Sequence, residues 1–197
     1  MKTRKQTENT PAQLLKDAVF QKTLHEIAMQ SGENFEKLQQ EAEGYLEELH
    51  TQHQPVANTL FLEAIQYILS RGYDRNIDVN PTEIKKLTKV MRQHPIAFVT
   101  THKSYIDTLV LSLVLARHGL PIPYTFAGIN LDFFGAGQLA RQNGVIFIRR
   151  SFKDNPVYKA SLRHYIAWLL DQQAHFVWAI EGTRSRTGKL VWPQMGI

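Results

Sequence analysis

The stretch PIAFVTTHKSYIDTLVLSLVLARHGLPIPYTFA, residues 95–127, decides the fold. Its apolar runs at 96–101 and 123–127 have the length and composition of buried strands, and the segment at 104–117 between them has the length of a helix. Strand, helix and strand in this order are typical of a βαβ unit, in which the two strands lie parallel in one sheet.

The same alternation continues beyond this unit. Further apolar runs at 145–148 and 176–180 predict two more strands, and the segments at 132–141 and 156–172 predict two more helices. The sequence therefore predicts an α/β domain over 95–197, with a mostly parallel sheet flanked by helices.

The residues before this domain have helical periodicity. Apolar residues recur every three or four positions through most of residues 1–94, and a loop is expected at 71–80. One helix start is marked by Asn80 as N-cap, Pro81 at the first helical position and Glu83 in the first turn. We therefore expect an α-helical N-terminal segment over 1–94.

Positive charge is concentrated in the α/β part. Residues 1–94 hold 12 Lys and Arg against 13 Asp and Glu, whereas residues 95–197 hold 11 against 5, so the net charges are −1 and +6. This asymmetry predicts an anionic partner for the second half. The absence of cysteine excludes disulfides, thiolate catalysis and cysteine metal sites. No apolar run reaches the ~18 to 20 residues of a membrane-spanning helix, and no secretory signal is expected after the basic start.

Polar residues follow three of the predicted strands. His102 comes after the first strand, Arg149 and Arg150 after the third, and the loop at 181–186 after the fourth. The carboxyl ends of parallel strands meet at one edge of a sheet, where ligands collect. These residues are therefore predicted to converge on one crevice.

His102 and Asp107 form the first candidate constellation. A carboxylate one turn into the helix can orient the imidazole of a histidine at the strand end, which then acts as a general base for a hydroxyl. The substrate alcohol takes the place that the serine has in a catalytic triad. The alternative is a capping box, in which Ser104 and Asp107 satisfy backbone N–H groups at the start of the helix and have no part in catalysis.

The second candidate is the cationic cluster of Arg149, Arg150 and Lys153. Guanidinium groups at the end of an apolar strand suit bidentate recognition of a phosphate. If the strand continues through the two arginines, their side chains point in opposite directions and only one contacts a ligand. The alternative is a strand end with solvated arginines.

The third candidate is the loop EGTRSR at 181–186. Gly182 permits a tight turn or a close backbone approach, and Arg184 and Arg186, two positions apart, can point along one face at an anion. Glu181 would anchor the loop or pair with an arginine. The alternative is a surface turn with scattered charges.

Signature motifs of several other classes are missing. The sequence has no G-x-S-x-G, no G-x-x-x-x-G-K-[ST] and no H-E-x-x-H. Serine hydrolysis, P-loop nucleotide binding and a zinc site therefore lack support, and we expect no metal and no cofactor. Nucleic-acid binding is disfavoured too, because the arginines lie at predicted strand ends rather than along one helix or an aromatic sheet face.

Together and in this order, the three segments resemble the glycerol-phosphate acyltransferase superfamily. Its PlsB- and PlsC-like members carry an H-x4-D motif, an apolar strand that ends in arginine, and a motif E-G-x-R-S, which stand here at 102–107, 144–150 and 181–185. The stretches AGINLDFFGAG at 127–137 and FIRRSFK at 147–153 are similar to the branch that acylates glycerol 3-phosphate or dihydroxyacetone phosphate. The resemblance covers roughly the second half of the chain.

The resemblance implies an O-acyltransferase of phospholipid biosynthesis. His102 is then the general base on a glycerol hydroxyl and Asp107 orients it, and the hydroxyl attacks the thioester of acyl-CoA or acyl-carrier protein without an acyl-enzyme. Because the product is a lipid, we expect a peripheral protein on the cytoplasmic side of a membrane. The resemblance assigns these residues to the phosphate pocket: Arg149, Arg150, Lys153, Glu181, Gly182, Arg184, Ser185 and Arg186.

The resemblance also leaves alternatives. A fourth, proline-containing motif of the family does not occur before Ile197, so we expect a fragment of a longer enzyme whose domain at 95–197 is truncated at its C-terminus. The acceptor is either glycerol 3-phosphate or, alternatively, dihydroxyacetone phosphate or a lysophospholipid such as lysophosphatidate. An alternative of another class is an inactive acyltransferase-like module that binds anionic lipid headgroups.

Overall fold

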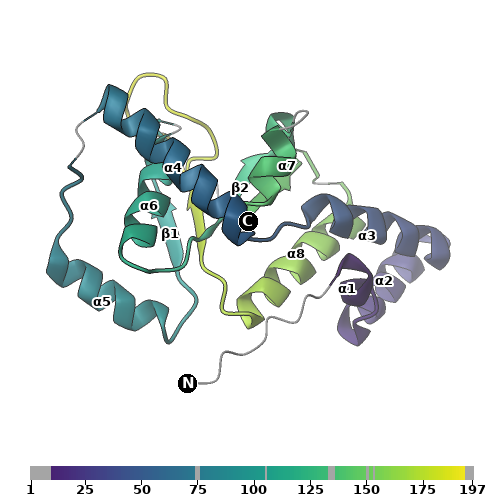
Figure 1. Ribbon diagram of the computed structural model, residues 1–197. Helices are drawn as coiled ribbons and strands as arrows, with labels where there is room; N and C mark the ends of the chain where they lie inside the picture. Colours follow the sequence, from purple (N-terminus) through teal and green to yellow (C-terminus); the bar gives the residue numbers. More distant parts are fainter. Residues whose placement is uncertain are drawn as a thin grey trace. The chain divides into compact units, whose positions relative to one another are not determined.

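The computed structural model describes residues 10–73, 76–104, 106–132, 136–149, 151–152 and 154–193. Helices fill the first half, and strands alternate with helices in the second half (Figure 1). The helices are α1 (Pro11–Leu15), α2 (Ala18–Ser31), α3 (Phe35–Leu49), α4 (Pro55–Gly72), α5 (Pro81–Met91), α6 (Ile106–Arg117), α7 (Ala136–Arg141) and α8 (Pro156–Asp171), with a 3-10 turn η1 (Ile129–Leu131). The strands are β1 (Ala97–Thr100), β2 (Tyr124–Gly128), β3 (Val145–Ile148) and β4 (Phe176–Ala179).

The four strands form one sheet in the order β1-β4-β2-β3. β4 pairs in parallel with both β1 and β2, and its register sets Thr100 of β1 opposite Ala179. Each strand end lies within one residue of its predicted position. The predicted fold class, an α/β fold with a parallel sheet, flanking helices and a helical N-terminal segment, is therefore confirmed.

Two predicted helices begin later than the sequence suggested. α6 begins at Ile106 because the Ser104 hydroxyl accepts the N–H of Ile106 at 3.1 Å, so Ser104 precedes the helix as a capping residue. The helix predicted at 132–141 is instead η1 followed by α7. Asp132 has φ −83° and ψ 78°, a conformation outside the helical region, and the helix cannot begin there.

The chain divides into two compact units, and each combines segments from before and after residue 94. The predicted domain division at that residue stays a prediction. The first unit comprises Met1–His50, Ala127–Asp132 and Ile146–Gln172, and it contains α1, α2, α3 and α8. Within it α8 packs against α2 and α3. Its buried hydrophobic side chains come from all four of these helices and from β3: Leu14, Leu15, Phe20, Leu24, Leu38, Ala42, Leu46, Leu49, Ile146, Phe147, Val157, Tyr158, Leu162, Tyr165 and Leu169.

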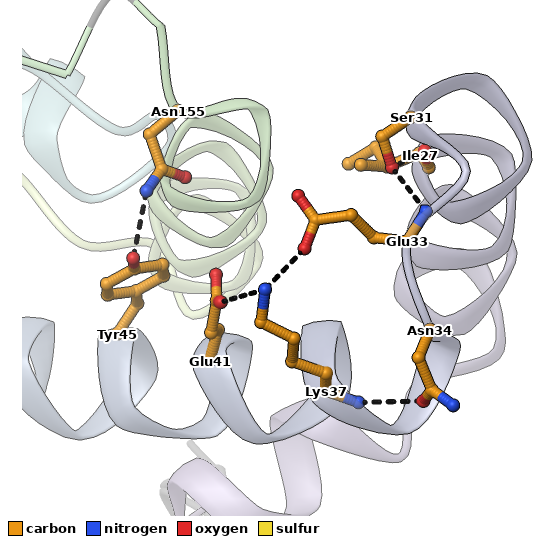
Figure 2. A network of polar contacts seen from close by, with 8 residues as sticks. All are labelled: Ile27, Ser31, Glu33, Asn34, Lys37, Glu41, Tyr45 and Asn155. Atoms are coloured by element: carbon orange, nitrogen blue, oxygen red, sulfur yellow. Dashed lines mark hydrogen bonds and ion pairs between the residues drawn. The ribbon is translucent and has the colours of Figure 1, made fainter.

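Polar contacts follow the surface of this helical packing. Figure 2 shows Lys37 of α3 between two carboxylates, with its Nζ 2.7 Å from Glu33 and 3.9 Å from Glu41. The same view shows Asn155 donating to the hydroxyl of Tyr45, at 2.8 Å. Exposed ion pairs contribute little to stability, so the buried apolar side chains hold this unit together.

The second unit comprises Thr51–Phe126, Phe133–Val145 and Gln173–Ile197. α4 packs against α6 around Ile65, Leu69 and Leu113, and a second apolar cluster joins α5 and α6 to β1. The predicted start of α5 is confirmed, because the Asn80 side chain accepts the N–H of Thr82 at 2.9 Å. Since β1 and β4 pair within this unit, it also carries the loops that follow them.

A buried histidine forms a hydrogen bond with the residue before β1, and it makes the stability of the protein depend on pH. His175 is 5% exposed, and its Nδ1 accepts the N–H of Ile96 at 3.1 Å. An accepting Nδ1 requires the neutral ring with its proton on Nε2. Burial lowers the pKa of His175 below the ordinary value of 6.5. The unfolded chain therefore takes up this proton more readily than the folded chain.

We expect the free energy of unfolding to decrease as the pH falls below about 6.5, by up to ~1.4 kcal/mol per pH unit for this proton. Urea denaturation at a series of pH values measures the slope. His175→Asn should reduce it, because asparagine can accept the N–H of Ile96 without titrating. Burial also lowers the pKa of His53, so part of the slope should remain in this variant. An identical slope in both proteins would contradict the assignment to His175.

Candidate functional site

His102 and Glu181 lie just beyond the carboxyl ends of two adjacent parallel strands, β1 and β4. The pairing continues for one bond past the strands, where the N–H of Ile180 donates to Thr100 O at 3.2 Å. The N–H of His102 then donates to Glu181 Oε2 at 2.8 Å. The N–H of Ser185 donates to His102 O at 2.7 Å. Residues nearly 80 positions apart are thus brought together at one edge of the sheet, as the strand order requires.

The Glu181 carboxylate is the centre of this arrangement. It is 2% exposed, and its second oxygen, Oε1, accepts the N–H of Val191 at 3.2 Å. A buried carboxylate needs such donors, because an unpaired buried charge is strongly unfavourable. Glu181 therefore connects the segment that carries His102 with the chain at Val191. Loop anchoring was one of the two roles expected for Glu181, and its hydrogen bonds to two backbone N–H groups are of the kind that anchors a loop.

The rest of the 181–186 loop is tightly turned. Gly182 has φ +67°, in the left-handed region, and its N–H donates to Ala179 O at 3.1 Å. Ser185 is 5% exposed, and its hydroxyl donates to Lys189 O at 2.7 Å. Arg184 and Arg186, on either side of Ser185, are exposed. The buried residues of the loop hold its shape while the two arginines remain accessible from solvent.

Asp107 contacts the backbone of the turn that carries His102. Its Oδ2 accepts the N–H of Lys103 at 3.0 Å and the N–H of Ser104 at 2.8 Å. The Ser104 hydroxyl in turn accepts the N–H of Ile106. These bonds match the capping interpretation, and they also fix the conformation of residues 102–104. A direct role of Asp107 in orienting the imidazole stays a prediction.

Arg149 follows β3 and belongs to the first unit. Its Nε lies 2.9 Å from Oε1 of Glu48 on α3, and its Nη2 lies 2.6 Å from Oε2. The hydrogen bond with Glu48 raises the pKa of Arg149 above its ordinary value. Arg150 and Lys153, which the sequence grouped with it, lie outside the described residues. The sequence offered no sign of Glu48, since a single glutamate on a helix resembles any solvated one.

Two further features bear on the site. Among the described residues, no three His, Asp or Glu side chains come together as metal ligands would, and the expectation of no metal or cofactor stays a prediction. In the same part of the chain, every helix is too short or too polar to cross a membrane.

Comparison with known proteins gives a consistent result. The family model described as Acyltransferase matches residues 81–197, which include all three predicted motifs. The chain is 36% identical over 186 residues to a protein named glycerol-3-phosphate acyltransferase from Aeromonas hydrophila subsp. hydrophila, over 94% of this chain and 23% of that protein. It is also 36% identical over 185 residues to Mycobacterium bovis and Mycobacterium tuberculosis proteins named as acyltransferase plsB1, over 94% of this chain and 29% of each.

The chain therefore spans less than a third of the length of these relatives. The family match nevertheless covers more than half of the chain, and it includes both strands that carry the His102 and Glu181 loops. The residues that the structure gathers at the edge of β1 and β4 are thus part of the matched region. This chain belongs to the acyltransferase family.

Proposed function

We propose that the protein transfers a fatty acyl group from a thioester donor to a hydroxyl of glycerol 3-phosphate. One observation carries the proposal. His102 is held at the carboxyl end of β1 through both of its backbone groups, and the partners, Glu181 and Ser185, belong to the loop with two exposed arginines. The segments that carry a potential base and cations suited to a phosphate are thereby joined by hydrogen bonds.

In the proposed reaction, the imidazole of His102 takes the proton of the acceptor hydroxyl as the oxygen attacks the thioester carbonyl. A C–O bond forms, the C–S bond of the tetrahedral intermediate then breaks, and the imidazolium returns the proton to the leaving thiolate. The enzyme forms no acyl intermediate of its own. The capping bonds of Asp107 support this role by holding the turn that carries His102.

The acceptor phosphate is proposed to bind to arginine side chains. Arg184 and Arg186 are exposed in the loop bonded to His102, and guanidinium groups recognise phosphates bidentately. The roles of Arg149, Arg150 and Lys153 rest on the resemblance to the family. Glu181, Gly182 and Ser185 shape the loop through their buried contacts. We further propose acyl-CoA or acyl-carrier protein as donor and peripheral attachment at the cytoplasmic side of a membrane, because the product is a lipid.

The acceptor is tested by kinetics on the full-length protein that contains this chain. Glycerol 3-phosphate, dihydroxyacetone phosphate and lysophosphatidate are compared with each donor. We expect kcat/KM for glycerol 3-phosphate to exceed that for the other two by about tenfold or more, a difference of ~1.4 kcal/mol in transition-state binding. A preference for lysophosphatidate would identify the alternative acceptor. If none of the three is acylated while anionic vesicles are bound, the inactive-module alternative is correct.

A further inference from the structure

The Arg149 guanidinium is held along one edge by the carboxylate of Glu48. A guanidinium has five N–H donors, and Glu48 accepts from Nε and Nη2. Nη1 has no hydrogen-bond partner among the residues that the structure describes. Within the described part of the chain, the edge formed by Nη1 and Nη2 therefore keeps a pair of donors without an acceptor, and we call it the free edge. The Arg149 side chain is 40% exposed, whereas that of Glu48 is 17% exposed, so the occupied edge faces the more buried of the two side chains.

Two tyrosine rings lie against the same guanidinium. Its carbon is 4.8 Å from the ring centroid of Tyr45 and 5.3 Å from that of Tyr158. Both rings are themselves held in place. The Tyr45 hydroxyl accepts from Asn155 (Figure 2), and the Tyr158 hydroxyl accepts the N–H of Arg149 at 3.0 Å. The ion pair and the two rings together restrict rotation of the guanidinium far more than a solvated arginine would experience.

We propose that Glu48 is a positioning residue that presents the free Nη1–Nη2 edge of Arg149 to the phosphate of glycerol 3-phosphate. The inference rests on the proposed function, which includes Arg149 among the phosphate ligands. Glu48 does not touch the substrate itself. It acts through Arg149 by fixing the direction of the two donors on that edge, one on Nη1 and one on Nη2, so that the phosphate binds to an oriented pair and little side-chain entropy is lost on binding.

The opposite role for Glu48 would be that of a competitor, whose carboxylate leaves Arg149 when the phosphate arrives. The geometry disfavours it. The Glu48 side chain is only 17% exposed where it lies, and separating its carboxylate from the Arg149 guanidinium would remove a compensating charge while a second anion comes close. Binding at the free edge leaves the Glu48 pair intact and adds a second bidentate contact.

The test compares Glu48→Gln with Glu47→Gln in the full-length protein. The two substitutions remove the same charge from neighbouring positions of α3, but Glu47 is exposed. We expect Glu48→Gln to raise KM for glycerol 3-phosphate about tenfold, with kcat and KM for the acyl donor changed less than about twofold. The Glu47→Gln variant should behave as the wild type. An unchanged or lower KM for glycerol 3-phosphate would overturn the proposal, as would equal losses in all three constants together with a lower Tm.

A binding measurement separates failure of this inference from failure of the proposed function. Calorimetric titration of glycerol 3-phosphate, without acyl donor, should show Kd raised about tenfold in Glu48→Gln relative to Glu47→Gln. If the wild type does not acylate glycerol 3-phosphate, the proposed function fails, and this Kd ratio still decides the role of Glu48. Sedimentation with vesicles that contain lysophosphatidate distinguishes the source of the phosphate. If only vesicle binding weakens, the Arg149 edge recognises a lipid headgroup and the proposal for glycerol 3-phosphate is wrong.

Discussion

Replacing His102 with alanine is expected to lower kcat for acylation of glycerol 3-phosphate by about 10²- to 10⁴-fold, the usual contribution of a positioned general base. KM for glycerol 3-phosphate should change less than about threefold, since other side chains are proposed to hold the phosphate. The measurement is steady-state kinetics of the full-length protein with saturating acyl donor.

This substitution leaves the backbone hydrogen bonds of residue 102 in place. His102 is bonded to Glu181 and Ser185 through its backbone N–H and C=O, and alanine keeps both groups. The loops should therefore remain joined through these two bonds, and a thermal melt of the variant checks that the protein is still folded. His118→Ala is a matched control, because this histidine is exposed after α6. Unchanged turnover in His102→Ala would remove His102 from the mechanism.

Local signals account for the parts of the fold that were predicted. Each strand is a short run of four or five mostly apolar residues, and such a run can be recognised in the sequence alone. The start of α5 is encoded equally locally, because Asn80 caps N–H groups two and three residues away. The helix predicted at 132–141 was inferred from the segment between two apolar runs, and that pattern does not define its first residue. The actual conformation of Asp132 depends on the 3-10 turn that precedes it.

Long-range pairs account for what a single sequence could not reveal. The order of parallel strands predicted that the loops after β1 and β4 would meet, but not that Glu181 would bond to the backbone of His102, 79 residues away. The ion pair between Arg149 and Glu48 joins residues 101 positions apart, and nothing in the sequence around either residue indicates the other. The motif at 102–107 allowed two interpretations, capping and catalysis. The two backbone bonds use only Oδ2 of Asp107, so capping by this residue does not by itself exclude a catalytic role.

Replacing Glu181 with glutamine is expected to destabilise the protein and slow the reaction, although the two side chains have nearly the same shape. Glu181 receives an N–H from His102 on one oxygen and an N–H from Val191 on the other. An amide has only one oxygen, so its NH2 group must face one of these donors. One of the two part-buried N–H groups loses its acceptor, at a cost of about 1 to 3 kcal/mol.

The loss should affect kcat more than KM, because the disturbed bond positions the proposed base rather than the phosphate ligands. We expect kcat to decrease about 10- to 100-fold in Glu181→Gln. This range is typical when the residues that hold a catalytic group in position allow it to shift by a fraction of an ångström. Urea denaturation and steady-state kinetics measure the two effects on the same preparation. Glu83→Gln on α5, an exposed glutamate paired with Lys86, provides the matched control and should change neither. Wild-type stability and turnover in Glu181→Gln would show that the bond between Glu181 and His102 does not hold the site together.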